Sequence, residues 1–193
     1  MEAEQLDITL IEEQVRQILD SVPGHVWDGR SLPVPVDDIV DSVYGLRIRL
    51  VEDMSAAPGC PGIDGTLSGL LLTGAGEIWV NAEEASRWDG RRRFTIGHEL
   101  GHFVMHQVTR PRVYCRKAEI DEGEGTEVPK PAKPLPEAEA DAFSAALLMP
   151  AELVADRHRT IGPEIEPLCE AFNCSQKAMV HRLDSLALAE GRH

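Results

Sequence analysis

Five consecutive residues, His98-Glu99-Leu100-Gly101-His102, have the types and spacing of a hydrolytic metal site. Residues four apart lie on one face of an α-helix, so His98 and His102 can direct two imidazoles at a single metal ion. Glu99 follows the first histidine and can act as the base for a water bound to that ion. The pattern therefore predicts hydrolysis by a metal-activated water.

The segment around this motif has the apolar spacing of a helix. Ile96, Leu100 and Phe103 form one stripe, and no proline interrupts residues 90–107, which we expect to be helical. The plainer alternative is two partly exposed histidines on an ordinary amphipathic helix. It is disfavoured because a buried acid between the two histidines would be costly without a partner.

A third metal ligand has to come from outside the motif, because catalytic zinc takes three protein ligands and leaves one position for water. The extended form H-E-x-x-H-x-x-G-x-x-H is excluded, since Met105 and Val108 stand where it needs Gly and His. His106 lies one turn after His102 and could be a ligand on a distorted helix. Packing beside the site, or a hydrogen bond within it, is the favoured role for His106.

A carboxylate from a separate helix is the other common solution, and the segment Glu137-Ala-Glu-Ala-Asp141 supplies candidates. Glu137 and Asp141 share one polar helix face, whereas Glu139 lies beside Phe143 on a face expected to be core. The spacing alone leaves open which acid binds the metal. Glu137 and Asp141 could also form a solvated stripe with no ligand role.

Charge and composition limit the classes of function. The 193 residues include 33 acidic and 19 basic side chains, for a formal net charge of −14. This excess argues against non-specific binding to nucleic acid or to an anionic membrane, because both need a basic face. No apolar run is long enough to span a membrane, and the first residues lack a signal-peptide pattern. We therefore expect a cytoplasmic protein whose four cysteines are reduced thiols.

Periodicity predicts elements of both types along the chain, in an α+β arrangement. The expected helices cover residues 8–21, 36–43, 90–107, 137–149, 151–158, 164–172 and 176–188, and the expected strands cover 46–51, 66–73 and 77–81. The last two strands are joined as a hairpin.

Residues 108–136 form a polar, proline-rich segment between the two candidate ligand helices. A structureless segment of this length inside a domain is usually a lid, a binding loop or disorder. Cys115 within it could supply a thiolate to the fourth position of zinc and so create a latent enzyme, although an ordinary free cysteine is the favoured interpretation. Tyr114 is, together with His106, a candidate second donor to an oxyanion.

Two segments resemble the paired signatures of ImmA/IrrE-type metallopeptidases: RFTIGHELGHFVMH at residues 93–106 and EAEADAFSAALLMP at residues 137–150. The resemblance covers most of residues 36–188, weakly so towards the C-terminus. It implies an α+β fold with a small zincin-like domain over residues 1–150, in which a short β-sheet packs on the motif helix. Residues 151–193 would then form a helix-turn-helix-like bundle packed on the same domain.

The resemblance also implies a reaction and a ligand set. His98, His102 and Glu137 would hold one zinc ion per chain, with Glu99 as the general base and Asp141 in a supporting or structural role. The same ligands accept manganese, iron or cobalt. The targets known for the family are helix-turn-helix transcriptional repressors, whose cleavage releases phage, mobile-element or DNA-damage genes. The implied partner is therefore a protein repressor in a stress response.

The sequence departs from the family pattern in two places. The segment between the two metal-binding helices is long, and Gly97 replaces the more usual alanine before the first histidine. Neither departure removes a catalytic group. The long segment leaves substrate access open.

Two rival functions come from other classes. A regulatory domain could keep the metal and act by binding a partner, but the intact Glu99 favours catalysis, because a structural zinc site needs no base. A DNA-binding regulator rests on residues 168–186, where Ser175 would open a recognition helix. Lys177, His181 and Arg182 are the only basic residues there, and the acidic surroundings favour a packing role instead.

Overall fold

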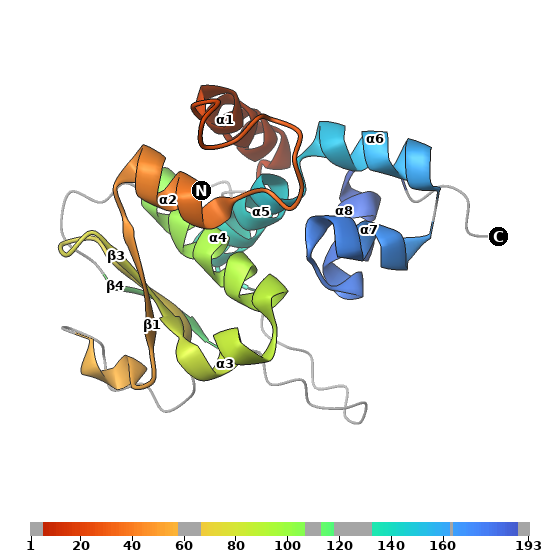
Figure 1. Cartoon of the computed structure of the whole chain (residues 1–193). Coiled ribbons are helices and arrows are strands. Elements are labelled where there is room, and N and C mark those ends of the chain that lie inside the picture. The colour runs from red at the N-terminus through yellow and green to blue at the C-terminus, as the bar shows by residue number, and fades with distance from the viewer. Residues whose placement is uncertain (1–5, 58–66, 107–112, 118–132, 163, 189–193) are drawn as a thin grey trace, which may run out of the picture.

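The computed structural model describes residues 6–57, 67–106, 113–117, 133–162 and 164–188, which form a small mixed sheet with helices packed on it (Figure 1). In chain order the elements are α1 (Ile8–Ser21), α2 (Val36–Tyr44), β1 (Arg47–Val51), the 3-10 turn η1 (Met54–Ala56), β2 (Leu67–Leu72), β3 (Glu77–Asn81), α3 (Ala82–Arg87), α4 (Asp89–Met105), β4 (Val113–Lys117), α5 (Leu135–Leu148), α6 (Ala151–Ile161), α7 (Ile165–Phe172) and α8 (Gln176–Ser185). The α+β class expected from the sequence is confirmed.

The sheet has the strand order β1-β3-β2-β4. β1 pairs in parallel with β3, whereas β2 runs antiparallel to both β3 and β4. Every residue of β2 is buried, since Leu71 packs in the main core with α4 while Leu70 and Leu72 pack on the opposite face beside Trp79. A strand covered on both faces has a continuous apolar sequence rather than an alternating one. This accounts for the run Leu70-Leu-Leu72.

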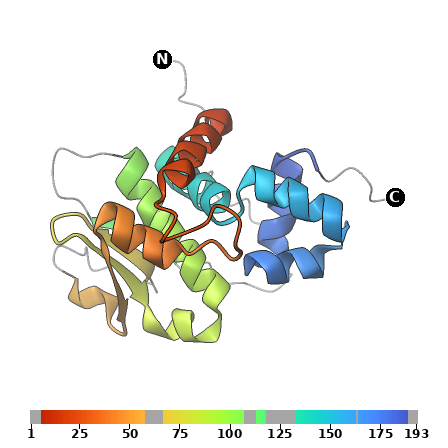
Figure 2. The same ribbon diagram turned by 45° about the horizontal axis from the view of Figure 1, so that its top comes forward.

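The helices α4 and α5 carry the two candidate ligand segments and lie side by side (Figures 1 and 2). Two glycines of α4 face α5 at close range. A Cβ at Gly101 would lie 3.1 Å from the Cα of Ala140, and a Cβ at Gly97 would lie 2.6 Å from the Oγ of Ser144. Because glycine has no side chain, it permits this approach, which explains why Gly97 suits the position where the sequence departs from the family pattern.

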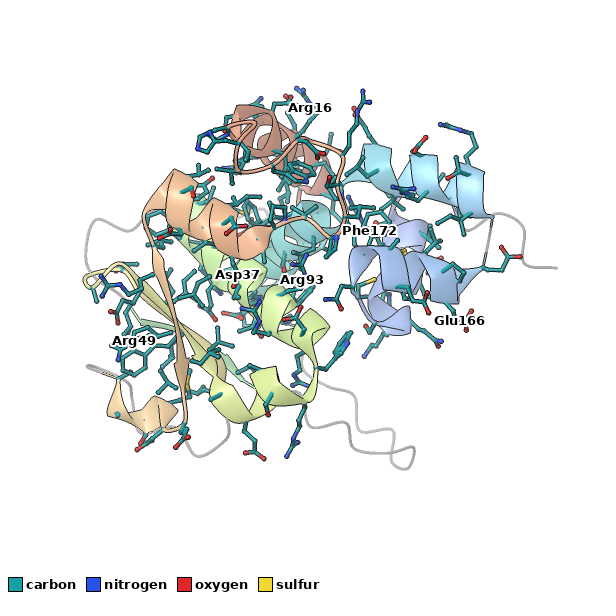
Figure 3. All side chains as sticks on the ribbon, viewed as in Figure 1. Arg16, Asp37, Arg49, Arg93, Glu166 and Phe172 are labelled. Carbon is teal, nitrogen blue, oxygen red and sulfur yellow. The ribbon has the colours of Figure 1, made fainter. Side chains whose placement is uncertain are left out.

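The N-terminal half of α4 is also tied to α2 and to the segment before it. Arg92 forms a bidentate ion pair with Asp37 of α2, with distances of 2.6 and 3.0 Å. Arg93 is buried and donates to the carbonyl of Val34 at 2.6 Å. Figure 3 labels Asp37 and Arg93 at this contact. The motif helix is thus held from two sides.

The C-terminal helices α6, α7 and α8 lie at the end of the molecule opposite the sheet (Figure 2). Their buried side chains, among them Leu168, Phe172 and Leu183, belong to the same core cluster as α4 and α5. Arg182 of α8 is buried; it donates to the carbonyl of Met149 at 2.8 Å and pairs with Glu12 of α1. One continuous core therefore joins the described helices of both halves of the chain.

Two elements differ from the sequence-based expectations. Residues 113–117 form the edge strand β4, although residues 108–136 were expected to contain no strand. Only the first residues of β4 favour a strand, and the prolines and charged residues around them obscure that preference in the sequence. The helix α3 was also not expected; Asn81 caps it by accepting a hydrogen bond from the N–H of Glu84 at 3.1 Å. Most of residues 108–136, for which a lid, a binding loop or disorder was expected, lies outside the described residues. None of the described helices combines the length and apolarity needed to cross a bilayer.

Candidate metal centre

Three ligand-type side chains from α4 and α5 meet at one point. The Nε2 of His98 lies 3.3 Å from one carboxylate oxygen of Glu137, and the Nε2 of His102 lies 3.2 Å from the other. The two Nε2 atoms are 3.1 Å apart, and the three ligand atoms all lie within 4.8 Å of one another. Both imidazoles are buried, while the Glu137 side chain is 26% exposed. Of the three residues, Glu137 is therefore the most exposed.

The charges of these groups suit a divalent cation. Burial lowers the pKa of His102, because it disfavours the charged imidazolium, and neutral imidazole is the form that binds a metal. Burial acts to raise the pKa of Glu137, but hydrogen bonds with His102 and His98 outweigh it and hold that pKa well below its usual range. Two neutral imidazoles and one carboxylate fit a site with three protein ligands and an open position.

Glu99 is completely buried. Its side chain fits beside the neighbouring strand β2 because that strand has a glycine, Gly69, at the point of contact. A Cβ at Gly69 would lie 2.8 Å from the Oε1 of Glu99 and 2.5 Å from the Cγ2 of Thr95. Any side chain larger than hydrogen at Gly69 would therefore press on the carboxylate. Sequence reasoning missed Gly69; a lone glycine inside an apolar strand, which often marks a close approach, was the available signal.

Asp141 lies behind the first histidine rather than among the ligand atoms. Its Oδ1 is 2.8 Å from the Nδ1 of His98, and its other oxygen pairs with Lys133. Burial acts to raise the pKa of Asp141, but the hydrogen bonds from His98 and Lys133 outweigh it and lower that pKa overall. An ionised Asp141 can accept the Nδ1 proton of His98 and leave Nε2 available for a metal.

His106 and Glu139 lie behind the second histidine. The Nδ1 of His106 is 3.0 Å from the Nδ1 of His102, and the Nε2 of His106 is 2.9 Å from the Oε2 of Glu139. The sequence neighbours of Glu139 suggested a position in the core. Its side chain is instead 23% exposed, and its carboxylate contacts His106 at the edge of the site. Tyr114 and Cys115 lie in β4 opposite residues of β2, but their side chains fall outside the part that the structure describes.

The model of the IrrE N-terminal-like domain, Peptidase_M78, matches residues 66–184, which is well over half of the chain. The chain belongs to this family. No curated protein matches the sequence. The matched range runs from the start of β2 to α8 and includes both helices of the candidate centre, and membership of the IrrE N-terminal-like family supports a metallopeptidase-type function.

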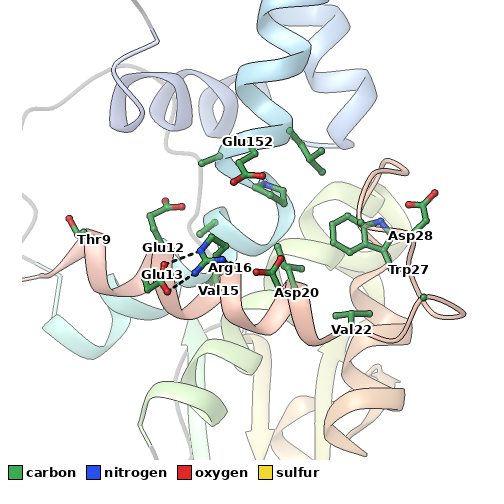
Figure 4. A pocket seen from close by; sticks show the side chains of 17 residues that line it. Thr9, Glu12, Glu13, Val15, Arg16, Asp20, Val22, Trp27, Asp28 and Glu152 are labelled. Atoms are coloured by element: carbon green, nitrogen blue, oxygen red, sulfur yellow. Dashed lines mark hydrogen bonds and ion pairs between the residues drawn. The ribbon is translucent and has the colours of Figure 1, made fainter.

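A cavity of about 610 Å³ lies elsewhere, between α1, the segment that follows it and the start of α6 (Figure 4). None of the candidate site residues whose side chains the structure describes lines it. Its acidic rim is largely paired within the fold, since Glu13 and Asp20 both bind Arg16, and Glu12 binds Arg182. The cavity is therefore separate from the candidate metal ligands His98, His102 and Glu137.

Proposed function

We propose that the protein is a zinc-dependent endopeptidase in which His98, His102 and Glu137 hold the ion and Glu99 is the general base. The observation that carries the proposal is the meeting of the three ligand atoms at the α4–α5 contact, within 4.8 Å of one another. The buried carboxylate of Glu99 on the same helix supports catalysis, because a purely structural zinc site fills its fourth position and needs no base.

The chain's own groups would divide the work of peptide hydrolysis. A bound divalent ion supplies Lewis-acid chemistry, lowering the pKa of a coordinated water towards about 7 and polarising the scissile carbonyl. Glu99 accepts the proton from the attacking water as the new carbon–oxygen bond forms, and passes it to the amine nitrogen as the carbon–nitrogen bond breaks. His98 and His102 are held in orientation by Asp141 and His106. For the second donor to the oxyanion we propose Tyr114 rather than His106, because both ring nitrogens of His106 face other side chains, those of His102 and Glu139.

We propose a helix-turn-helix transcriptional repressor as the substrate, in a cytoplasmic stress response. The resemblance of the two signature segments to ImmA/IrrE-type peptidases supports this substrate class. The net charge of −14 also supports it, since an acidic protein attracts a basic DNA-binding partner. Direct DNA binding by the chain itself is disfavoured, because Arg182 of the would-be recognition helix is buried against Glu12.

Removal and return of the metal tests the enzymatic function. A helix-turn-helix repressor encoded beside this protein's gene is the first substrate to try, incubated with the purified chain and followed by mass spectrometry. We expect defined fragments, their loss after zinc is chelated and dialysed away, and their return when zinc is added back. Cleavage that continues unchanged in the metal-free protein would contradict the proposal. Metal binding with no cleavage of any repressor would favour the regulatory alternative.

A further inference from the structure

The second histidine of the motif is linked to a carboxylate through another imidazole. His102 Nδ1 lies 3.0 Å from His106 Nδ1, and His106 Nε2 lies 2.9 Å from Glu139 Oε2. The ring centroids of the two histidines are 5.1 Å apart, and their planes are tilted by 47°. Both distances are within hydrogen-bond range. The three side chains thus form one chain of contacts that leads away from the ligand atoms.

The direction of hydrogen bonding along this chain follows from which nitrogen faces the metal. If His102 binds through Nε2, the atom that lies 3.2 Å from Glu137, its ring proton must be on Nδ1. That proton is then donated to His106 Nδ1, which must be the acceptor. His106 consequently carries its own proton on Nε2 and donates it to the Glu139 carboxylate. Each group has one role, and the three roles are mutually consistent.

We infer that His106 is a positioning residue, which with Glu139 fixes the tautomer and the ring orientation in which His102 presents Nε2 to the metal. The inference rests on the metal site proposed above. It adds a pair of residues to that site and assigns a role to Glu139, which the sequence placed on the core face of its helix.

The two motif histidines are therefore supported in different ways by the same helix. His98 donates directly to Asp141 at 2.8 Å, whereas His102 reaches Glu139 only through His106. Asp141 and Glu139 are two residues apart on α5, while His98 and His102 are one turn apart on α4. Groups that accept the ring N–H of a metal-binding histidine, on the nitrogen that does not bind the metal, commonly affect metal affinity by about 10- to 100-fold.

A purely structural role for His106 has to be separated from a positioning role, because His106 also caps α4. Its backbone N–H donates to the carbonyl of His102 at 3.1 Å. Two substitutions separate the roles. His106→Ala removes the acceptor, while His106→Asn keeps an oxygen that can accept a hydrogen bond near the position of Nδ1. The exposed histidine of α8 supplies a matched control, His181→Ala.

The test measures metal binding on the full chain, so it does not depend on a substrate. Zn²⁺ affinity is obtained by competition with a chromophoric chelator, and the geometry of the ligands is read from the visible absorption of the Co²⁺ form. We expect His106→Ala to bind Zn²⁺ about 10- to 100-fold more weakly with an altered Co²⁺ spectrum, and His106→Asn to recover most of the affinity. His181→Ala should match the wild type.

Equal losses in His106→Ala and His106→Asn, or wild-type affinity in His106→Ala, would overturn the inference while leaving the metal site intact. A wild-type chain that binds no Zn²⁺ would overturn the proposed function and this inference together. If His106→Ala does not fold, Glu139→Ala takes its place, with Glu139→Gln as its conservative partner. The positioning role then requires weaker Zn²⁺ binding in the alanine variant and recovery in the glutamine variant.

Discussion

Three acids within one helical turn and a half of α5 contact the histidines of α4 in three different ways. Glu137 faces both motif histidines, Asp141 accepts from His98, and Glu139 contacts His106. The sequence alone identified the histidines and Glu99, because their spacing is set within a single helix. It could not choose among the acids, because that choice depends on how α5 is rotated against α4. The resemblance to a family implied Glu137, which we propose as the third ligand.

Replacement of the acids should therefore have graded effects on metal binding. We expect Glu137→Ala to weaken Zn²⁺ binding by more than the 10- to 100-fold typical of residues behind a ligand, because it removes a ligand atom. Glu139→Ala should fall within that range, and the exposed Glu83→Ala should have no effect. Chelator competition on the three variants gives the order. If Glu139→Ala lost more affinity than Glu137→Ala, the third ligand would be Glu139 and not Glu137.

At the level of elements, glycines set the distances between the parts of the site. Gly97 and Gly101 allow α5 to approach α4, and Gly69 allows β2 to approach Glu99. Sequence periodicity placed most helices and strands near their observed bounds, since burial on one face creates the period. It missed β4, because an edge strand needs little apolar sequence and pairs mainly through its backbone. The approaches at Gly97 and Gly101 were not predictable, because nothing in a helical pattern marks them, whereas Gly69 carried the signal of a lone glycine in an apolar strand.

The approach of β2 to α4 can be tested by Gly69→Ala. Alanine normally suits a strand better than glycine, but here its Cβ would lie 2.5 Å from Thr95 Cγ2 and 2.8 Å from Glu99 Oε1. We expect the free energy of unfolding to fall by about 1–3 kcal/mol, measured by urea denaturation.

Thr95→Ser removes the first of these contacts, because serine lacks the Cγ2 methyl. We expect Gly69→Ala to impair cleavage as well, because its Cβ presses on Glu99. Added to Gly69→Ala, Thr95→Ser should restore much of the stability but not the cleavage, because the contact with Glu99 persists. Gly24→Ala is the matched control, since nothing lies within 4 Å of a Cβ there. Stability and activity that recover together would show that Gly69 does not act through Glu99.

At the scale of the whole molecule, α8 is tied to the first helix of the chain. Arg182 is 3% exposed, donates to Met149, and binds Glu12, which lies 170 residues away in sequence. We propose on this basis that residues 151–193 fold with residues 1–150 as one unit. The sequence suggested a helix-turn-helix in this region, but it could not show that Arg182, one of its three basic residues, points into the core.

Cooperative unfolding tests this proposal. Arg182→Met should lower the free energy of unfolding by about 2 kcal/mol, because charged hydrogen bonds are lost and Met149 keeps an unpaired carbonyl. Tryptophan fluorescence reports only on residues 1–150, where Trp27, Trp79 and Trp88 lie, whereas far-ultraviolet circular dichroism reports on all helices. We expect the two signals to shift together in the variant. A separate early transition seen only by circular dichroism would show that the C-terminal helices unfold on their own.

The most direct test of the central claim is the behaviour of Glu99→Gln, loaded with zinc and incubated with the intact repressor that the wild type cleaves. Glutamine keeps the shape of the side chain but cannot accept the proton of the attacking water, so we expect one zinc ion per chain, as in the wild type, with cleavage slower by at least about 100-fold. The exposed Glu83→Gln should cleave at the wild-type rate. Zinc-loaded Glu99→Gln that cleaves as fast as the wild type would contradict the account.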